Sequence, residues 1–324
     1  MGSKKMKYSL EVYSNKYEEA WDTLVSESPV GTFLHSRSFL SYHKDRFLDC
    51  SFVLINKEKG ALEAVFPCAL DKNSKLATSH PGSTYGGIVT RTTMTPEILK
   101  CFLDGIIDQL KVKNVEELVY KITPDIYRLD YSNLDEYFIW QAQGTNYRND
   151  LSNIIDLHKP FKFSSRRKRG IKKAQKYNVT YSSNCDFTND IWKILESNLA
   201  EHNVKPVHSL DEIKLLKKKF PNNIFLHMAL DVSGQPLCGV VAFHMGGVVH
   251  AQYIFSSPEA RECGALDFLF ATLIELAIED SCSYFSFGAS SEMQGQLLNN
   301  GLYNFKAEFG SRGVLNRTYR LKIK

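Results

Sequence analysis

The sequence lacks the cysteine spacing of a metal site. Its seven cysteines are scattered and no CxxC pair occurs. Most of them have apolar neighbours, as Cys68 does, and in such surroundings a cysteine acts as a small hydrophobic side chain. The pattern favours a reducing compartment and argues against a zinc site, so no metal is expected.

Long apolar runs and a secretory leader are missing as well. The most apolar stretch, 268–278, contains Glu275 and is too short to span a bilayer. The first seven residues are polar and no leader-like apolar region follows them. Met6 stands where a myristoylation signal needs Ser or Thr. These absences predict a cytoplasmic protein without stable membrane insertion.

A large excess of one charge is also absent. The 40 Lys and Arg nearly balance the 36 Asp and Glu, and the net charge of +4 does not by itself imply a nucleic-acid partner. Hydrophobic residues make up 43% and charged residues 23%, which predicts an ordinary globular core. A chain of 324 residues is long enough for two domains of ordinary size or one large domain.

Apolar periodicity predicts an α/β protein with mixed sheets. Two hairpins are expected, 51–56 with 61–70 and 223–230 with 236–244, because strand-like runs flank short turns. The other main expectations are helices at 96–111, 166–176 and 261–278 and strands at 137–142, 152–157, 284–287 and 314–323. The two halves share an order of elements, although no sequence identity supports a repeat. This order predicts domains at 1–145 and 146–324.

The stretch from Tyr284 to Gly310 carries the main site prediction. It begins as a short apolar strand, breaks at Gly288 and continues as a polar loop that holds Ser290 and Glu292. It ends in Phe-Lys-Ala-Glu-Phe-Gly, with the lysine at 306. A strand end that opens into such residues is where an α/β fold usually keeps its chemistry. The alternative is a turn and helix with an incidental lysine.

This stretch resembles the end of the FemAB-like branch of the GNAT acyltransferases. There, a strand ending in Phe-Gly is followed by Gly-Leu, which Gly301 and Leu302 match, and then by Phe-Lys and Phe-Gly. The resemblance runs from about residue 10 to about residue 320. It implies an acyltransferase built from two tandem GNAT-like domains, with Lys306 at the reaction centre. A lysine there could hold the developing oxyanion or a substrate phosphate; otherwise it is a surface lysine.

The GNAT resemblance also implies a donor site in the C-terminal domain. The family places acyl-CoA between a central strand and the next helix, which gives the cofactor-binding candidates Ile254, Phe255, Arg261, Gly264 and Ala265. The positive end of the helix would favour a pyrophosphate, and an arginine would add charge-assisted bonds. Leu266, however, stands where Gly or Ala is expected. The co-substrate is therefore expected to be acetyl-CoA or another acyl-CoA, with aminoacyl-tRNA open as the alternative.

Acyl transfer to an amine needs a neutral amine, a polarised carbonyl and a protonated leaving group. A general base contributes roughly 10² to 10⁴ in rate, so the residues near the acyl carbon matter most. The catalytic candidates are Lys306, Glu292, His250 and Tyr253. On a strand, His250 and Gln252 share one face and Tyr253 lies on the other. The general base is not assigned.

Seven of the eleven residues at 166–176 are basic. Ile171 and Ala174 supply an apolar face and no aromatic platform is interleaved, so a solvated helix face is favoured over a nucleic-acid or membrane surface. The run also resembles the first helix of the second FemAB-like domain, with Lys168 in place of its leading arginine. A further hypothesis is that it collects phosphates. The substrate-binding candidates are Tyr85, Arg166, Arg169 and Ser290.

Three functions follow from these patterns. Within the branch, Tyr85-Gly86-Gly87 and 298–302 look most like acyltransferases of surface-polysaccharide biosynthesis, which implies N-acylation of an amino sugar on a nucleotide or lipid. The second is an aminoacyl-tRNA-dependent Fem-type transferase that acts on a peptidoglycan precursor. No long helical arm is found at 187–222, which favours the first. The third is a non-catalytic nucleic-acid or membrane-surface protein, which would not need the loop at 284–310.

Overall fold

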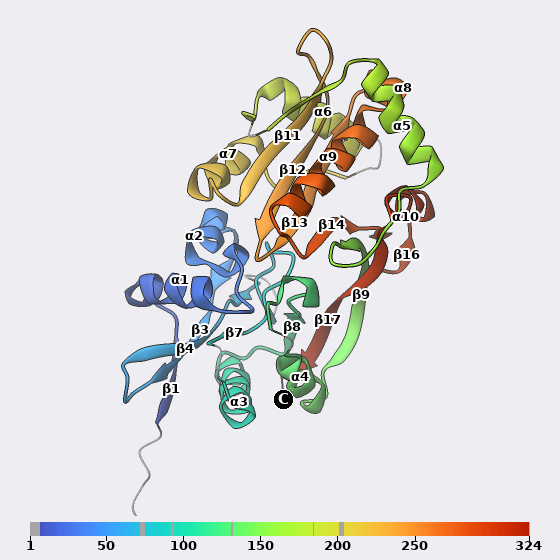
Figure 1. Cartoon of the computed structure of the whole chain (residues 1–324). Helices are drawn as coiled ribbons and strands as arrows, with labels where there is room; N and C mark the ends of the chain where they lie inside the picture. Colours follow the sequence, from blue (N-terminus) through green and yellow to red (C-terminus); the bar gives the residue numbers. More distant parts are fainter. Residues whose placement is uncertain are drawn as a thin grey trace, which may run out of the picture. The chain divides into compact units, whose positions relative to one another are not determined.

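The structure is a computed structural model that describes residues 7–71, 75–91, 94–130, 132–183, 185–200 and 204–323. It divides into two compact units (Figure 1). Unit 1 is Met1–Asn149 with Asn316–Lys324, and unit 2 is Asp150–Leu315. The strands β9 (Thr145–Asp156) and β17 (Arg312–Lys322) both cross the boundary, so the chain returns to unit 1 with its last residues.

Unit 1 contains two sheets. The first has the order β1-β3-β4-β7, with antiparallel neighbours, and the second includes β17-β8-β6-β5-β2, in which β6 and β8 run parallel. Its strands are β1 (Tyr8–Val12), β2 (Leu48–Asp49), β3 (Phe52–Asn56), β4 (Ala61–Phe66), β5 (Ala69–Leu70), β6 (Leu76–Thr78), β7 (Val89–Thr90) and β8 (Glu117–Lys121). Its α-helices are α1 (Glu18–Glu27), α2 (Arg37–Leu40), α3 (Pro96–Val112) and α4 (Leu134–Gln141). Short 3₁₀ helices lie at η1 (Asn15–Tyr17), η2 (Phe33–His35), η3 (Ser41–Arg46) and η4 (Asp125–Tyr127).

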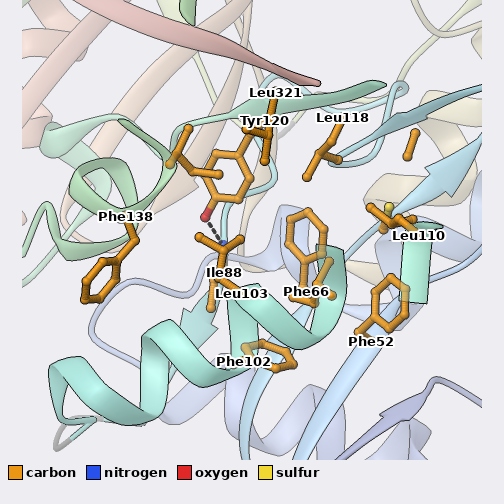
Figure 2. Close-up of a cluster of buried hydrophobic side chains, with 14 of the residues drawn as sticks. Phe52, Phe66, Ile88, Phe102, Leu103, Leu110, Leu118, Tyr120, Phe138 and Leu321 are labelled. Atoms are coloured by element: carbon orange, nitrogen blue, oxygen red, sulfur yellow. Dashed lines mark hydrogen bonds between the residues drawn. The ribbon is translucent and has the colours of Figure 1, made fainter. Parts of the chain in front are cut away.

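The core of unit 1 forms between α3 and the strands (Figure 2). Phe52 of β3 lies opposite Phe66 of β4, and the Phe66 ring stacks on Tyr120 with 5.5 Å between centroids. The Tyr120 hydroxyl accepts a hydrogen bond from the Ile88 N–H at 2.8 Å, so this buried polar group is satisfied within the core. The buried side chains of α3 recur at helical spacing, which turns one face of the helix toward the core: Leu99, Phe102, Leu103, Ile106 and Leu110.

Unit 2 contains the strand order β10-β11-β12-β13-β14-β9, in which β13 and β14 run parallel and the other neighbouring strands are antiparallel. Its strands are β10 (Thr180–Ser182), β11 (Ile224–Leu230), β12 (Pro236–Met245), β13 (Val248–Ser256), β14 (Tyr284–Ala289), β15 (Ser291–Glu292) and β16 (Leu297–Leu298). Its helices are α5 (Ser165–Lys176), α6 (Asn189–Ala200), α7 (Leu210–Lys219), α8 (Pro258–Cys263), α9 (Ala265–Glu279) and α10 (Asn300–Ala307). Helix α9 buries apolar residues on nearly every side, as predicted, and its Phe270 ring contacts Phe287 of β14 at 4.9 Å.

The two predicted hairpins are confirmed. β3 pairs with β4 and β11 with β12 in antiparallel register, and the turn residues Gly60 and Gly234 both have positive φ. In the first hairpin the expected strand 61–70 is broken after Phe66. Pro67 cannot donate a ladder hydrogen bond, and the chain resumes pairing only at β5.

Two other element predictions were wrong. Residues 137–142, expected as a strand, lie mainly in α4, where Asp135 and Glu136 occupy the first turn and suit the positive end of a helix. The predicted helix 261–278 is two helices, α8 and α9. Gly264, with φ of +80°, separates them in a left-handed conformation that favours glycine.

Candidate active site

Two parallel strands of unit 2 separate part-way along their length. The register of β13 with β14 covers three pairs, from Val248 with Tyr284 to His250 with Ser286. β13 then continues to Ser256 without a partner on that side among the described strands. β14 instead bends at Gly288, which has φ of +74°, and shifts its register against β9 there. An unpaired strand edge offers backbone N–H and C=O groups to an extended ligand.

A bulge in β13 adds to this opening. Its register with β12 shifts between Val241 and Ala242, which leaves Gln252 as the extra residue. A bulge increases the local twist of a strand and redirects its side chains. The bulge lies just beyond His250, the last residue paired to β14, so both irregularities of β13 occur at the same place.

Lys306 is buried at the bend of β14. Its side chain comes from α10, which begins at the N-cap Asn299, and only 2% of the residue is exposed. Its Nζ donates to the backbone oxygens of Gly288 at 3.1 Å and Ala289 at 2.6 Å. No carboxylate pairs with it in the part of the chain that the structure describes. Burial lowers the pKa of Lys306 to about 7, so the side chain can change its protonation state near neutral pH.

His250 and Ser286 form a pair on the two strands where they separate. The His250 Nδ1 and Ser286 Oγ lie 3.0 Å apart, and Ser286 Oγ also accepts from the Gly288 N–H at 3.3 Å. Burial, and secondarily the charge of Lys306, lower the pKa of His250 to about 4. The imidazole is therefore neutral at pH 7, with one unprotonated ring nitrogen. Ser286 was not among the predicted site residues.

The other two catalytic candidates have different surroundings. Tyr253 is buried, and its hydroxyl lies 2.6 Å from His208 Nδ1, while Trp192 of α6 contacts its ring edge-on. Burial raises the pKa of Tyr253 to about 12. Glu292 is exposed on β15 and accepts from Asn299 Nδ2 at 2.7 Å, so it supports the start of α10. Direct contacts thus connect His250 with Ser286, and Lys306 with the bend of β14.

Ser290 belongs to a buried polar network next to this bend. Its hydroxyl donates to Asn153 Oδ1 at 2.7 Å, and Asn153 Nδ2 donates to Ser311 Oγ at 3.1 Å. All three residues are fully buried. Ser290 therefore holds the loop after β14 to β9 and to the start of β17. The position of Asn153 directly before the apolar pair Ile154 and Ile155 was the signal that could have identified it.

The candidate donor residues lie around the start of α9. Phe255 and Ala265 are buried in the core, Ile254 is half-buried, and Arg261 is exposed on the short helix α8. A Cβ at Gly264 would lie 2.5 Å from the backbone oxygen of Gly170. The glycine is thus required by the close approach of α5. Phe255 and Ala265 can offer a ligand only their backbone groups.

The basic run is a solvated face with one exception. Arg166 and Arg169 are exposed on α5, whereas Arg167 is buried. Arg167 pairs with Asp267 at 2.5 Å and Glu308 at 2.6 Å and lies 4.3 Å above the Phe305 ring. Arg167 therefore ties α5 to α9 and to the end of α10, and the prediction of a solvated face does not hold for it.

Tyr85, the remaining predicted substrate residue, lies in unit 1. It is buried, its hydroxyl is 3.0 Å from Thr32 Oγ1, and its ring stacks on Tyr127 with 5.0 Å between centroids. These contacts account for Tyr85 by packing alone. No group of three or more metal-ligating side chains occurs among the described residues, and no helix described here is long and apolar enough to cross a membrane.

Comparisons with known proteins agree with this architecture. Residues 162–306 match the model of a family described as an acetyltransferase (GNAT) domain, and no curated protein sequence matches the chain. The solved structure of FemX is similar with a TM-score of 0.68 and 11% identity, over 97% of each chain. L-PGS from Bacillus licheniformis gives 0.60 and 14%, over 94% of this chain and 90% of that one. A tandem GNAT protein from the clavulanic acid biosynthesis pathway gives 0.54 and 10%, over 98% and 99%.

At these identities the similarity shows the fold. The predicted fold class, α/β with mixed sheets and two tandem GNAT-like domains, is confirmed. The predicted resemblance to the FemAB-like branch is confirmed for the fold.

Proposed function

We propose that the chain is an acyltransferase that transfers an acyl group from coenzyme A to the amine of an amino sugar, because residues 162–306 match a GNAT acetyltransferase domain and the chain shares the fold of FemX. The sugar would be carried on a nucleotide or a lipid during surface-glycan biosynthesis in the cytoplasm. Lys306 acts at the reaction centre, and His250 with Ser286 handles the proton. The proposal for the donor depends on the separation of β13 from β14.

The separated strands suit an acyl-CoA arm. The pantetheine part of coenzyme A is an extended chain with two amide groups, which can hydrogen-bond to a free strand edge as another strand would. The edge of β13 beyond His250 provides such a partner. Ile254, which belongs to this part of β13, is half-buried and would supply an apolar wall. The thioester would then lie near the bend of β14, where Lys306 is held.

The hydrogen bonds of Lys306 are the observation that carries its role. A lysine ammonium has three N–H donors. Two of them are given to the Gly288 and Ala289 carbonyls, and the third has no acceptor in the described part of the protein. A fixed donor in a buried site is well suited to an oxyanion that forms during reaction. The same proton could pass to the leaving thiolate, since a pKa of about 7 makes the transfer accessible.

The reaction then balances with the residues of this site. The amine nitrogen attacks the thioester carbon, the carbonyl oxygen becomes an oxyanion beside Lys306, and the carbon–sulfur bond breaks as the amide forms. The neutral His250 accepts the proton that the amine loses, directly or through the Ser286 hydroxyl. The thiolate takes a proton from Lys306. No metal takes part in this sequence.

A second donor, aminoacyl-tRNA, is supported by a different observation. The first turn of α9 holds Asp267, which is paired with Arg167, and α5 packs against the N-cap Gly264. Both features restrict a pyrophosphate at this helix end. The exposed cations of α5 suit an RNA backbone instead. In this case the acceptor would be a peptidoglycan precursor, and Lys306 would keep its role in ester aminolysis.

The test is an initial-rate assay of the full chain with acetyl-CoA or aminoacyl-tRNA as donor and a panel of UDP- and dTDP-amino sugars, together with a peptidoglycan precursor, as acceptor. With the productive pair, Lys306→Ala is expected to lower kcat at least tenfold, or about 1.4 kcal/mol of transition-state stabilisation. Lys193→Ala, on the exposed side of α6, is the matched lysine control and should keep the wild-type kcat. Wild-type kcat in Lys306→Ala would contradict the proposed role.

A further inference from the structure

A cluster of large apolar side chains is exposed in unit 2 between β14 and α10. It comprises two residues of the β15–β16 hairpin, its turn residue, and one residue of the first turn of α10; we call it the apolar strip. Its members, with their exposed fractions, are Met293 (71%), Leu297 (49%), Leu298 (37%) and Leu302 (37%). Single exposed apolar residues need no explanation, but here four large apolar side chains are exposed within ten residues, 293–302, and such a concentration marks an interaction surface.

The strip is held in place rather than loosely attached. Ser291 and Glu292 pair with Leu298 and Leu297 across the hairpin. The Asn299 side chain bonds to Glu292 and also caps α10 by accepting from the Leu302 N–H at 2.9 Å. The hairpin that carries these residues is therefore held at a fixed position relative to α10.

A cationic face lies at the other end of α10. It consists of the six exposed basic residues of α5: Arg166, Lys168, Arg169, Lys172, Lys173 and Lys176. The Ser164 N–H, at the start of α5, donates to the Glu308 oxygen at the end of α10, so the two helices meet there. Figure 1 shows α5, α10 and β16 along one edge of unit 2. Helix α10, about 12 Å long, joins the cationic face to the apolar strip.

We propose that the apolar strip and the cationic face together dock unit 2 on an anionic lipid bilayer. Leucine and methionine side chains can enter the boundary between headgroups and acyl chains, while each nearby Lys or Arg gains about 1 kcal/mol from an anionic surface. Lys306 is one turn of α10 from Leu302, so docking places the reaction centre beside the bilayer. Building on the proposed acyl transfer, the acceptor amine would be carried on a lipid rather than on a free nucleotide.

The apolar strip favours a bilayer over RNA as the partner. An RNA backbone would use the cations of α5 alone, and single-stranded bases would need exposed aromatic rings on which to stack. The members of the strip are aliphatic and hence suit acyl chains. A nucleotide-linked acceptor, similarly, needs phosphate contacts but no aliphatic surface.

The experiment is co-sedimentation of the full chain with vesicles of phosphatidylcholine, alone or with about a third phosphatidylglycerol. We expect binding to the anionic vesicles that weakens between about 0.1 M and about 0.5 M salt. Met293→Ser combined with Leu297→Ser should reduce the partition coefficient at least tenfold. Lys168→Gln, Lys172→Gln and Lys176→Gln together should also reduce it at least tenfold, at low salt only.

Matched controls use surface residues of unit 2 outside both groups. The control for the Met293/Leu297 variant is Val232→Ser, at a residue 73% exposed in the β11–β12 turn. The control for the α5 lysines is the combination of Lys193→Gln, Lys214→Gln and Lys218→Gln. Both control variants should bind vesicles as the wild type does. Circular dichroism of every variant checks that its fold is intact.

The contrary outcomes separate a failure of bilayer docking from a failure of the proposed acyl transfer. Absence of wild-type binding to anionic vesicles, or wild-type binding by the Met293/Leu297 variant, contradicts the bilayer as the partner. Binding to tRNA that needs the α5 lysines but not the strip would assign the surface to RNA. Vesicle binding requires no turnover, so docking without acyl transfer would instead count against the proposed function. The Met293/Leu297 variant should keep its turnover on a soluble amino-sugar acceptor.

Discussion

Both units bury cations, and Arg128 in unit 1 and Lys306 in unit 2 have different kinds of partner. In unit 1, Arg128 and Asp135 form an ion pair whose side chains are only 4% and 8% exposed, and Asp135 also accepts from the Tyr120 hydroxyl at 2.9 Å. In unit 2, Lys306 is as deeply buried but bonds only to two backbone oxygens among the residues that the structure places. The Arg128–Asp135 pair compensates both of its charges. Within the described residues, the charge on Lys306 has no carboxylate to compensate it, so the charged form is destabilised by burial.

This difference separates a structural site from a reactive one. A buried ion pair is strongly disrupted when one partner is removed, because the other is left as an uncompensated charge. A buried lysine without a carboxylate relieves its desolvation by losing a proton, and its pKa falls accordingly. With a pKa of about 7, Lys306 can lose or regain its charge during a reaction beside it. Arg167, paired with Asp267 and Glu308, belongs with Arg128 in this comparison.

The largest effect is expected from Arg128→Met, which would leave Asp135 buried without its cation. We expect a loss of about 3–5 kcal/mol in the free energy of unfolding, measured by urea denaturation. Arg320→Met is the control, since Arg320 is partly exposed and its nearest carboxylate oxygen, on Glu117, is 3.7 Å away. The control should change stability by less than about 1 kcal/mol. Equal losses in both variants would show that the buried Arg128–Asp135 pair contributes no more to stability than the partly exposed Arg320 does.

The next largest effect concerns Gly264, the residue between α8 and α9. Gly264→Ala should cost at least about 2 kcal/mol, because the new methyl group would meet the Gly170 oxygen and the backbone has φ of +80°. Gly301→Ala, in α10, is the control: its methyl group would meet only Asn299 Oδ1, at 3.5 Å, so stability should stay the same or rise slightly. If Gly264→Ala unfolds like the wild type, the Gly170 oxygen of α5 does not lie against Gly264.

The sequence predicted local patterns well and long-range contacts poorly. Alternation and turn residues identified both hairpins, and an unbroken apolar pattern identified the burial of α9. Residues 137–142 have the aromatic and β-branched content of a strand, and the helix was missed because its acidic first turn lies outside that window. The break at Gly264 follows from the approach of α5, which no local pattern records.

In the candidate site, too, local features could be predicted from the sequence and long-range contacts could not. Lys306 and the bend at Gly288 could be located from the motif, and both now lie in direct contact. The network of Ser290, Asn153 and Ser311 could not, because its hydrogen bonds join residues 137 and 158 positions apart. The burial of Arg167 within a basic run was missed for the same reason, since Asp267 is 100 positions away.

Lys306 should make the stability of the protein depend on pH. The folded-state pKa of Lys306, about 7, lies below its ordinary value of 10.5, so between these values the unfolded state binds more protons. Stability should therefore rise as pH increases from about 7 toward about 10, with a slope of up to about 1.4 kcal/mol per pH unit from this group. Lys306→Met should remove this contribution and be more stable than the wild type below pH 7. Parallel stability–pH curves for the two proteins would contradict the lowered pKa.

The smallest effect is expected at Arg261, an exposed arginine with a proposed role in donor binding. Arg261→Gln should leave the free energy of unfolding within about 0.5 kcal/mol of the wild type, since surface substitutions rarely do more. If acyl-CoA is the donor, losing one charge-assisted contact to its pyrophosphate should raise the KM for acyl-CoA about fivefold or more with kcat unchanged, the signature of lost uniform binding. Arg46→Gln, in unit 1 and with its side chain over the Tyr42 ring, is the control and should leave that KM unchanged. An unchanged KM for acyl-CoA in Arg261→Gln would remove α8 from the donor site. The second donor, aminoacyl-tRNA, would then be tested by changing Lys168 and Lys172 of α5 to glutamine. A raised KM for aminoacyl-tRNA in that variant would favour this donor, and Lys306 would keep its place at the centre of the reaction.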